Sequence, residues 1–534
     1  MNDFYNHYKG VFLAWVLGSV SLLAHSNAFG QLKALTRYEA ELKNLDNGFT
    51  LVPMNKNGIA LIRENNKFKE SKRVWEVTLL NTALEVQWQT EFKLKPEFTL
   101  IGYDSSAQTV YLLFREGNND ANQFELVQVN SQDKTVNNYE IKQQFDFRIT
   151  HFSIVGENAV LGGYVSREPA LLLYETAQRN VKVIPGFFLK DNELLDVRIN
   201  VNQTFNTLLV ERNSFDKKHL VSKTFDQSGL LLLEDYIEID KDKTILTGQS
   251  SSLLREDLII IGTYSEGAST EALGYYTALV DPYTEQAIQY FPFATLDHLL
   301  DYMPKKRAEK IMEKANERIA AGKNPDYKAA VEPFRIVEYA KGFFLLSEMY
   351  DPASTVNSRP YWNDPYNPYR GGYGYSRYGY NSYLNQYPYS SYPYNTVPQN
   401  SSVKMIQTML TFFDGKGQLK YDYALKFENI KLPALQQTSD FNVQGNLLSL
   451  AYKKESNLYV ITGLLGEEVE ADTVQVPTKN PNDLVRYESE DDTGIRYWYG
   501  DYFFVWGYQS IRNKGKSEED PLRHVFYISK FMAE

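Results

Sequence analysis

The chain contains 534 residues with no cysteine, so disulfides, thiolate catalysis, iron–sulfur clusters and Cys-ligated zinc are excluded. Its net charge of −11 argues against non-specific binding to nucleic acid, which needs clustered Lys and Arg against phosphates. Hydrophobic residues make up 43% of the chain, and the 40 Tyr and 30 Phe favour pleated, half-buried strands. The composition therefore predicts a large β-rich core.

Residues 1–30 have the order of a secretory signal peptide. Lys9 precedes an apolar run over residues 11–24, and the small residues Ala28 and Gly30 follow it before Gln31. That run is shorter than the roughly 20 residues that span a bilayer. We therefore expect export to the periplasm, the cell envelope or the extracellular space, and no transmembrane segment after cleavage. An uncleaved N-terminal anchor is the alternative.

One type of segment recurs along residues 31–534: a turn residue, then four or five apolar residues, then a polar stop. Such runs are typical of strands that are buried on both faces. Most intervals between successive runs are 47–56 residues, and the two longer ones, 85 and 103, each contain an insertion. The middle residues of the eight runs are Leu61, Leu112, Leu161, Leu208, Ile260, Leu345, Leu448 and Phe504.

A shorter β-like segment precedes each buried run and a hairpin with a polar turn follows it. Four strands in about 50 residues are typical of a propeller blade. The sequence therefore predicts an all-β fold, a single β-propeller of about eight four-stranded blades over residues 31–534. A seven-bladed ring with one degenerate unit and a pair of stacked β domains are the alternatives.

The two ends of the chain are expected to meet. The last unit ends in a strand-like segment at residues 524–531 and lacks an outer strand, whereas residues 32–42 form a spare β-like segment. Pairing the two would hold both chain ends and remove a free sheet edge. We therefore expect the N-terminal strand to complete the last blade.

In this repeat the chain resembles the broad class of WD40-like and quinoprotein-like β-propellers. The resemblance is one of architecture, because the Gly-His and Trp-Asp pairs of WD40 repeats are absent from this sequence. It implies a ring of blades and carries no family function.

The first insertion, residues 296–333, is expected to be helical. Apolar residues recur at helical spacing after Pro304, which suits a first helical turn, and Gly322 suits the end. The other face is rich in basic residues, with Glu309, Glu313 and Glu317 interspersed. We expect either a helix on the rim of the ring with a solvated face or a docking helix for an anionic partner. The basic residues are Lys305, Lys306, Arg307, Lys310, Lys314 and Arg318.

The second insertion, residues 351–400, is a low-complexity loop rich in Tyr, Pro, Gly and Asn. Twelve Tyr lie between Tyr361 and Tyr394. Tyr offers a flat, amphipathic surface at low entropic cost, which favours a contact loop for a protein or glycan, although a neutral expansion is the alternative. The candidate partner-binding residues are Tyr361, Trp362, Tyr366, Tyr369, Arg370, Tyr373, Tyr375, Arg377, Tyr378 and Tyr380.

No catalytic, metal-binding or cofactor motif is found. The four His outside the signal segment, His151, His219, His298 and His524, have no metal-ligand spacing and are expected to be surface or satisfied core residues. Two acidic runs, Asp240/Asp242 and Glu488/Glu490/Asp491/Asp492, lack the spacing of a calcium loop and are expected to be solvated turns.

These observations favour a non-enzymatic, exported β-propeller that binds a protein or scaffolds an assembly in the cell envelope, without a cofactor. A glycan-binding or glycan-processing propeller is the first alternative, because paired carboxylates at a propeller axis can hydrolyse glycans. A secreted structural or adhesive protein is the second.

Overall fold

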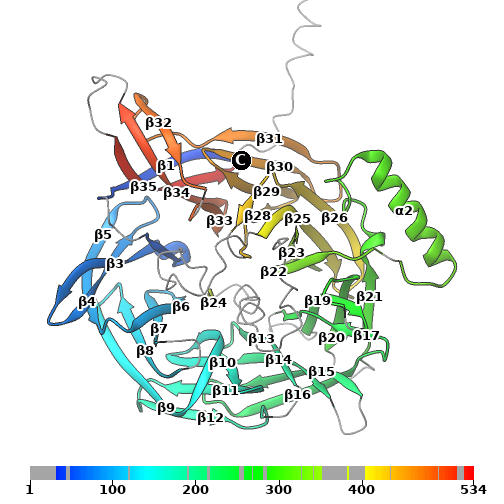
Figure 1. Ribbon diagram of the computed structural model, residues 1–534, viewed down its shortest axis with the longest axis horizontal. Coiled ribbons are helices and arrows are strands. Elements are labelled where there is room, and N and C mark those ends of the chain that lie inside the picture. Colours follow the sequence, from blue (N-terminus) through cyan, green and yellow to red (C-terminus); the bar gives the residue numbers. More distant parts are fainter. Residues whose placement is uncertain are drawn as a thin grey trace, which may run out of the picture.

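The computed structural model describes residues 32–43, 48–117, 121–188, 192–212, 217–251, 258–267, 269–280, 286–325, 327–340, 342–351, 382–383, 403–432, 435–490, 492–513 and 522–534. Within these ranges the strands form seven antiparallel sheets. The sheets follow one another around a common centre in chain order, as Figure 1 shows.

The first half of the chain forms four of the sheets. The first contains β2 (Thr50–Pro53), β3 (Ile59–Lys69), β4 (Lys72–Leu80) and β5 (Val86–Leu94). The second contains β6 (Phe98–Ser106), β7 (Thr109–Glu116), β8 (Ala121–Asn130), β9 (Thr135–Val155), β10 (Asn158–Val165), β11 (Glu168–Glu175), β12 (Asn180–Ile184) and the distant β24 (Ser382–Tyr383). The third contains β13 (Glu193–Ile199), β14 (Phe205–Arg212), β15 (Lys218–Phe225) and β16 (Leu231–Glu238). The fourth contains β17 (Lys243–Ile245), β18 (Gln249–Ser250), β19 (Leu258–Glu266), β20 (Gly274–Val280) and β21 (Ile288–Pro292).

The second half forms the remaining three sheets. The fifth contains β22 (Ala330–Tyr339), β23 (Gly342–Asp351), β25 (Val403–Asp414), β26 (Leu419–Lys426) and β27 (Lys431–Leu432). The sixth contains β28 (Ser439–Gln444), β29 (Leu447–Lys454), β30 (Asn457–Leu464) and β31 (Glu470–Gln475). The seventh contains β32 (Asp483–Glu488), β33 (Gly494–Tyr499), β34 (Tyr502–Asn513), β35 (Arg523–Ala533) and, from the other end of the chain, β1 (Leu32–Glu41).

The eight apolar runs are all buried strands. Their middle residues, Leu61, Leu112, Leu161, Leu208, Ile260, Leu345, Leu448 and Phe504, lie in β3, β7, β10, β14, β19, β23, β29 and β34, and each is at most 2% exposed. The sequence prediction of buried strands at these positions is confirmed.

One sheet departs from the expected four strands. β9 is 21 residues long, pairs with β8 over its first part and with β10 over its last part, and so joins eight strands into one sheet. Residues 139–150 contain neither Gly nor Pro, so no local signal ends the strand.

The hydrophobic core lies between neighbouring sheets. Most large clusters combine residues from two consecutive sheets, as when Val77 and Leu79 of β4 pack with Leu112 of β7. One cluster lies within the eight-stranded sheet, where Leu113 of β7 packs with Leu161 of β10. The last sheet packs on the first in the same way, through Phe504 and Phe526 against Leu61. Sheets that bury both faces against neighbours around a centre are the architecture of a β-propeller.

Buried aspartates connect inner strands around the ring, two of them between neighbouring sheets and one, Asp104, within the eight-stranded sheet. Asp440 of β28 accepts a hydrogen bond from the backbone N–H of Tyr497 in β33, with 2.8 Å between Oδ2 and N. Asp104 of β6 accepts one from Ile154 of β9 at 2.7 Å, and Asp196 of β13 one from Ser250 of β18 at 3.1 Å. These side chains satisfy edge N–H groups that sheet pairing leaves open.

One α-helix and two short 3₁₀ turns complete the described residues. The turns are η1 (Asn55–Asn57) and η2 (Phe293–Thr295), and α2 (Lys305–Ala320) lies on the outside of the ring in Figure 1. Ala308, Ile311 and Met312 pack α2 against the core between β19–β20 and β22–β25, and Ala315 is buried. No helix in the described ranges is long and apolar enough to cross a membrane.

Candidate functional site

The predicted Tyr-rich contact residues, from Tyr361 to Tyr380, lie outside the described residues. The described part of that insertion is β24, which pairs with the inner strand β6 through Ser382–Asp104 and Tyr383–Tyr103. β24 lies near the centre of the ring in Figure 1. This short piece of the insertion therefore contacts the axis side of the second sheet.

The basic face expected on the helical insertion is present on α2. The apolar stripe faces the core as predicted, except that Ile319 is 38% exposed. The cations Lys305, Lys306, Arg307, Lys310 and Lys314 are exposed, and Arg318 is half-buried. The first turn of α2 holds no acidic residue. Lys305, Lys306 and Arg307 lie at the N-terminal, positive end of the helix dipole, where cations lower the stability of the helix. Helix stability therefore does not account for their position.

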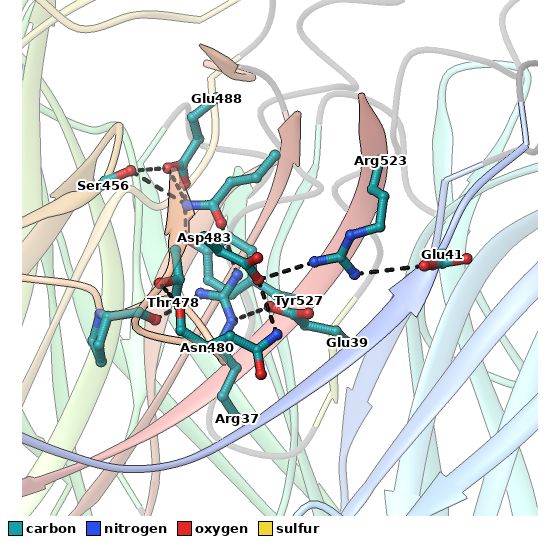
Figure 2. Close-up of polar contacts among 12 residues, drawn as sticks. Arg37, Glu39, Glu41, Ser456, Thr478, Asn480, Asp483, Glu488, Arg523 and Tyr527 are labelled. Atoms are coloured by element: carbon teal, nitrogen blue, oxygen red, sulfur yellow. Dashed lines mark hydrogen bonds and ion pairs between the residues drawn. The ribbon is translucent and has the colours of Figure 1, made fainter. Parts of the chain in front are cut away.

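A buried ionic cluster joins the last two sheets, and Figure 2 shows the part of it around Ser456, Glu488 and Tyr527. Nζ of Lys453 in β29 donates to Oε1 of Glu488 in β32 at 2.6 Å, and the two side chains are 0% and 3% exposed. Glu488 also accepts from Tyr527 of β35 at 2.7 Å and from Gln509 of β34 at 2.7 Å. Ser456 adds a fourth donor. Every oxygen of this buried carboxylate is therefore hydrogen-bonded.

Arg37 ties the N-terminal strand β1 to the same cluster. Its Nη2 donates to Oε1 of Gln509 at 2.7 Å, its Nη1 donates to the carbonyl of Pro477 at 3.0 Å, and its Nε donates to Glu39 at 2.8 Å. The guanidinium lies 3.8 Å from the ring centroid of Tyr527, a cation–π geometry. The chain ends are thus held by charge as well as by strand pairing.

Burial and charge displace the pKa values inside the cluster. Burial lowers the pKa of the Lys453 ammonium, although Glu488 opposes that change. Burial alone would raise the pKa of Glu488, but the Lys453 charge and the hydrogen bonds hold it below its ordinary value. Burial raises the pKa of Tyr527 well above its ordinary value. The Lys453 contact and the hydrogen bonds therefore favour the charged form of Glu488, and the cluster is suited to holding strands together.

This cluster corrects one sequence expectation. The run from Glu488 to Asp492 was expected to be a solvated turn, whereas Glu488 is 7% exposed at the end of β32. Its burial follows from Lys453 of the neighbouring sheet, which sequence spacing does not reveal. Asp242 of the other acidic run pairs with Lys243 at 3.1 Å and is 66% exposed, in keeping with a solvated turn.

The histidines are surface residues or have core partners. Nδ1 of His151 lies 2.8 Å from Oγ1 of Thr150 in the core, and His219 packs edge-on against Tyr236. His298 pairs with Asp301 at 2.8 Å at the surface. His524 lies 2.8 Å from the hydroxyl of Ser510. Among the described residues, no group of three His or acidic side chains is arranged to hold a metal ion.

Two buried carboxylates face each other on β22 and β23, and sequence reasoning missed them. Glu332 and Glu348 are direct cross-strand partners, and they are 3% and 0% exposed. Glu348 accepts from the backbone N–H of Ser439 at 2.7 Å and from that of Thr438 at 2.8 Å. Burial nevertheless raises the pKa of Glu348 to about 7. The signal in the sequence was Glu348 after Ser347, two polar residues within a predominantly apolar run.

Comparison with known proteins leaves the function open. No protein-family model matches the chain. No curated protein matches it. Among solved structures, polysaccharide lyase Uly1 is similar at 7% identity and a TM-score of 0.38, over 94% of this chain and 99% of that one. The Dos1 propeller is similar at 9% identity and a TM-score of 0.35, over 82% and 93%.

A third structure, the β-propeller domain of the Trilobed protease from Pyrococcus furiosus, is similar at 8% identity and a TM-score of 0.32, over 80% and 98%. Likenesses this distant say nothing about activity. The class of the protein is defined by its own repeated sheets, and that class is the β-propeller.

Proposed function

We propose that the ring has eight blades and that the N-terminal strand completes the last one. The eight-stranded sheet then counts as two blades, because β9 pairs with β8 up to Phe147 and with β10 from Arg148 onward. β1 supplies the outer strand of the last blade by pairing with β35, from Leu32–Ala533 to Glu41–Val525. The apolar packing of Phe504 on Leu61 supports a closed ring.

We also propose that this β-propeller is a non-enzymatic, exported protein that binds a partner and scaffolds an assembly in the cell envelope. The observation that carries the proposal is the exposed basic face of α2 on the rim of an acidic protein. α2 keeps only its apolar stripe on the core and turns its cations outward. A partner with an anionic surface, a protein or an acidic glycan, would complement this face.

The Tyr-rich loop is the second proposed contact element. Residues 361–380 combine Tyr and Trp with Arg370 and Arg377, a composition that suits stacking and hydrogen bonding to a partner. Residues 1–30 are proposed to direct export and to be removed, which would put both elements outside the cytoplasm.

Cross-linking in living cells tests this proposal. Reversing the charges of Lys305, Lys306 and Lys310 to Glu should abolish cross-links between α2 and its partner, and higher salt should weaken binding of the native protein. The matched control reverses Lys67, Lys69 and Lys72, which are exposed on the β3–β4 hairpin. Equal cross-linking by both variants would remove α2 as a docking element.

A second experiment separates the loop from the helix. A chain that lacks residues 359–395 keeps α2 and every described blade strand except β24. We expect it to lose part of the cross-linked partner while keeping its thermal stability. Unchanged cross-linking would assign the contact to α2 alone.

A glycan-processing function is the second candidate, and the Glu332–Glu348 pair favours it. Glycosidases use two carboxyl groups, one of which is kept protonated near neutral pH by a raised pKa. Glu348 has such a pKa, and Glu332 lies directly opposite. Incubating an acidic polysaccharide with the native protein and with the Glu332→Gln variant tests this second candidate. Hydrolysis by the native protein alone would establish a glycan-processing enzyme.

A further inference from the structure

The inner edge of the second sheet carries a strand from a distant part of the chain. β24 pairs antiparallel with β6, and the register sets Ser382 opposite Asp104 and Tyr383 opposite Tyr103. β6 pairs with β7 on its other side, so β24 is the end strand of this sheet near the centre of the ring in Figure 1. β24 also lies against β9. The added strand therefore covers the edge of β6 that lies toward the axis.

This strand belongs to the insertion of the fifth sheet. The chain leaves that sheet at Asp351, the end of β23, and re-enters it at Val403, the start of β25, and Asp351 is paired there with Lys404. In Figure 1, β23 and β25 lie on one side of the centre and β6 lies on the other. The pairing of β24 therefore joins the fifth sheet to the second sheet through the chain itself.

The residues of the inner strands explain why β6 accepts a further strand. Proline lacks the N–H that strand pairing uses, and β2 and β22 contain Pro53 and Pro333. Basic side chains hinder pairing at an edge, and β13 and β33 contain Arg198 and Arg496. β6 and β28 contain neither proline nor a basic residue. Among the inner strands that the structure describes, β6 is the one to which a distant strand is added.

The edge of β6 is also suited to the close approach of another backbone. Gly102 directly precedes the paired residues, and a glycine inside a strand often marks such an approach. The carboxylate of Asp104 accepts a hydrogen bond from the backbone N–H of Ile154 in β9 at 2.7 Å. Its charge is therefore engaged within the sheet and does not oppose the addition of a strand.

We infer that the inner edge of β6 is a strand-acceptor site and that β24 is its occupant in this chain. Strand addition supplies backbone hydrogen bonds and is a common way for a sheet to bind an extended peptide. Covalent attachment to β23 and β25 raises the effective concentration of β24 at this edge. An extended segment of a partner protein can add to β6 only when β24 leaves. The contact between β24 and β6 is therefore autoinhibitory.

A disulfide trap tests the register, because the native chain has no cysteine. Directly opposed residues of antiparallel strands have Cα atoms roughly 4.5–5.5 Å apart, within the range of a disulfide. Tyr103→Cys combined with Tyr383→Cys should therefore form an intramolecular disulfide under mild oxidation. The matched control combines Tyr383→Cys with Ser106→Cys, which lies farther along β6 by roughly 10 Å. The first pair should cross-link at least about tenfold faster, and equal rates would overturn the inference.

Hydrogen exchange gives an independent measurement that leaves the buried Tyr103 unchanged. It compares the native chain with the chain that lacks residues 359–395 and hence β24. Of the two paired residues on β6, one directs its N–H toward β24, so this amide should exchange at least about tenfold faster in the shortened chain.

The inner strand β13 is the internal control for this comparison, and its exchange should be the same in both chains. Unchanged exchange in β6, or equal acceleration in β6 and β13, would overturn the inference. Neither result depends on whether α2 binds an envelope partner, so the strand-acceptor site and the proposed docking helix can fail separately.

Discussion

Nζ of Lys453 and Oε1 of Glu488 lie 2.6 Å apart in the interior, and they join the sixth sheet to the seventh. Removing one partner of such a pair leaves the other charge buried without a counter-charge. The resulting loss of stability is larger than the net stabilisation that the intact pair provides. The stability of the region where the chain ends meet should therefore depend on this contact.

Glu488→Gln should lower the free energy of unfolding by about 3–5 kcal/mol, because the Lys453 ammonium loses its counter-charge. Glu91→Gln is the control: Glu91 pairs with Lys69 at the surface, where the side chains are 41% and 48% exposed. That change should cost at most about 1 kcal/mol. Urea denaturation measures both, and similar losses would contradict the prediction.

Arg37→Ala should destabilise the protein by about 2–3 kcal/mol, because three hydrogen bonds and a cation–π contact with Tyr527 are lost together. Lys33→Ala on the same strand removes an exposed ion pair with Glu534 and should have little effect. Thermal denaturation with limited proteolysis of the N-terminus would detect the difference. Equal melting temperatures for the two variants would rule out Arg37 as an anchor of β1.

Glu348 should make stability depend on pH. Its pKa is raised to about 7 in the fold, so the folded state keeps a proton that the unfolded state releases near its ordinary value of 4.5. Its contribution is complete below the unfolded pKa, and it falls by up to about 3 kcal/mol as pH rises to about 7.

Glu348→Gln removes this titration. Relative to the native protein, the variant should gain stability between about pH 5 and about pH 8, measured by denaturation at each pH. Glu125→Gln is a second test, because burial raises the pKa of Glu125 less strongly. A difference between native and Glu348→Gln proteins that does not change with pH would refute the prediction.

Asp440→Asn should cost about 2–4 kcal/mol. Asp440 accepts from Nη1 of Arg335 in the fifth sheet at 2.5 Å and from Tyr497 in the seventh, so it links three sheets. Asp472→Asn, on the exposed strand β31, should change stability by less than about 0.5 kcal/mol. Chemical denaturation distinguishes the two, and a neutral Asp440→Asn would show that the link is dispensable.

The strands and the helix could be predicted from the sequence because their signals are local. Leu112 and Leu448 stand in apolar runs with turn residues on each side, and Ala308 and Ile311 recur at helical spacing. Both periodicities can be read within about ten residues. The long β9 was not predicted, because a missing turn signal is harder to detect than a present one.

The buried polar contacts could not be predicted, because they join residues far apart in the chain. Arg37 and Gln509 are separated by 472 residues, and Glu348 and Ser439 by 91. The chain contains 67 acidic residues, and composition does not show which of them pair with a basic side chain in the fold. The exposure of Leu231, Leu232 and Leu233 on β16 was equally hidden, since an apolar run looks the same on a buried strand and on an outer edge.

The pairing of β1 with β35 has a consequence for biosynthesis. β1 is made first and its partner last, so the earliest strand waits until almost the whole chain has left the ribosome. Contacts between such distant residues form slowly, because a very long loop must close. A chain that stops before Arg523 leaves β1 without its partner strand, and such a nascent or truncated product is a natural target for chaperones and proteases.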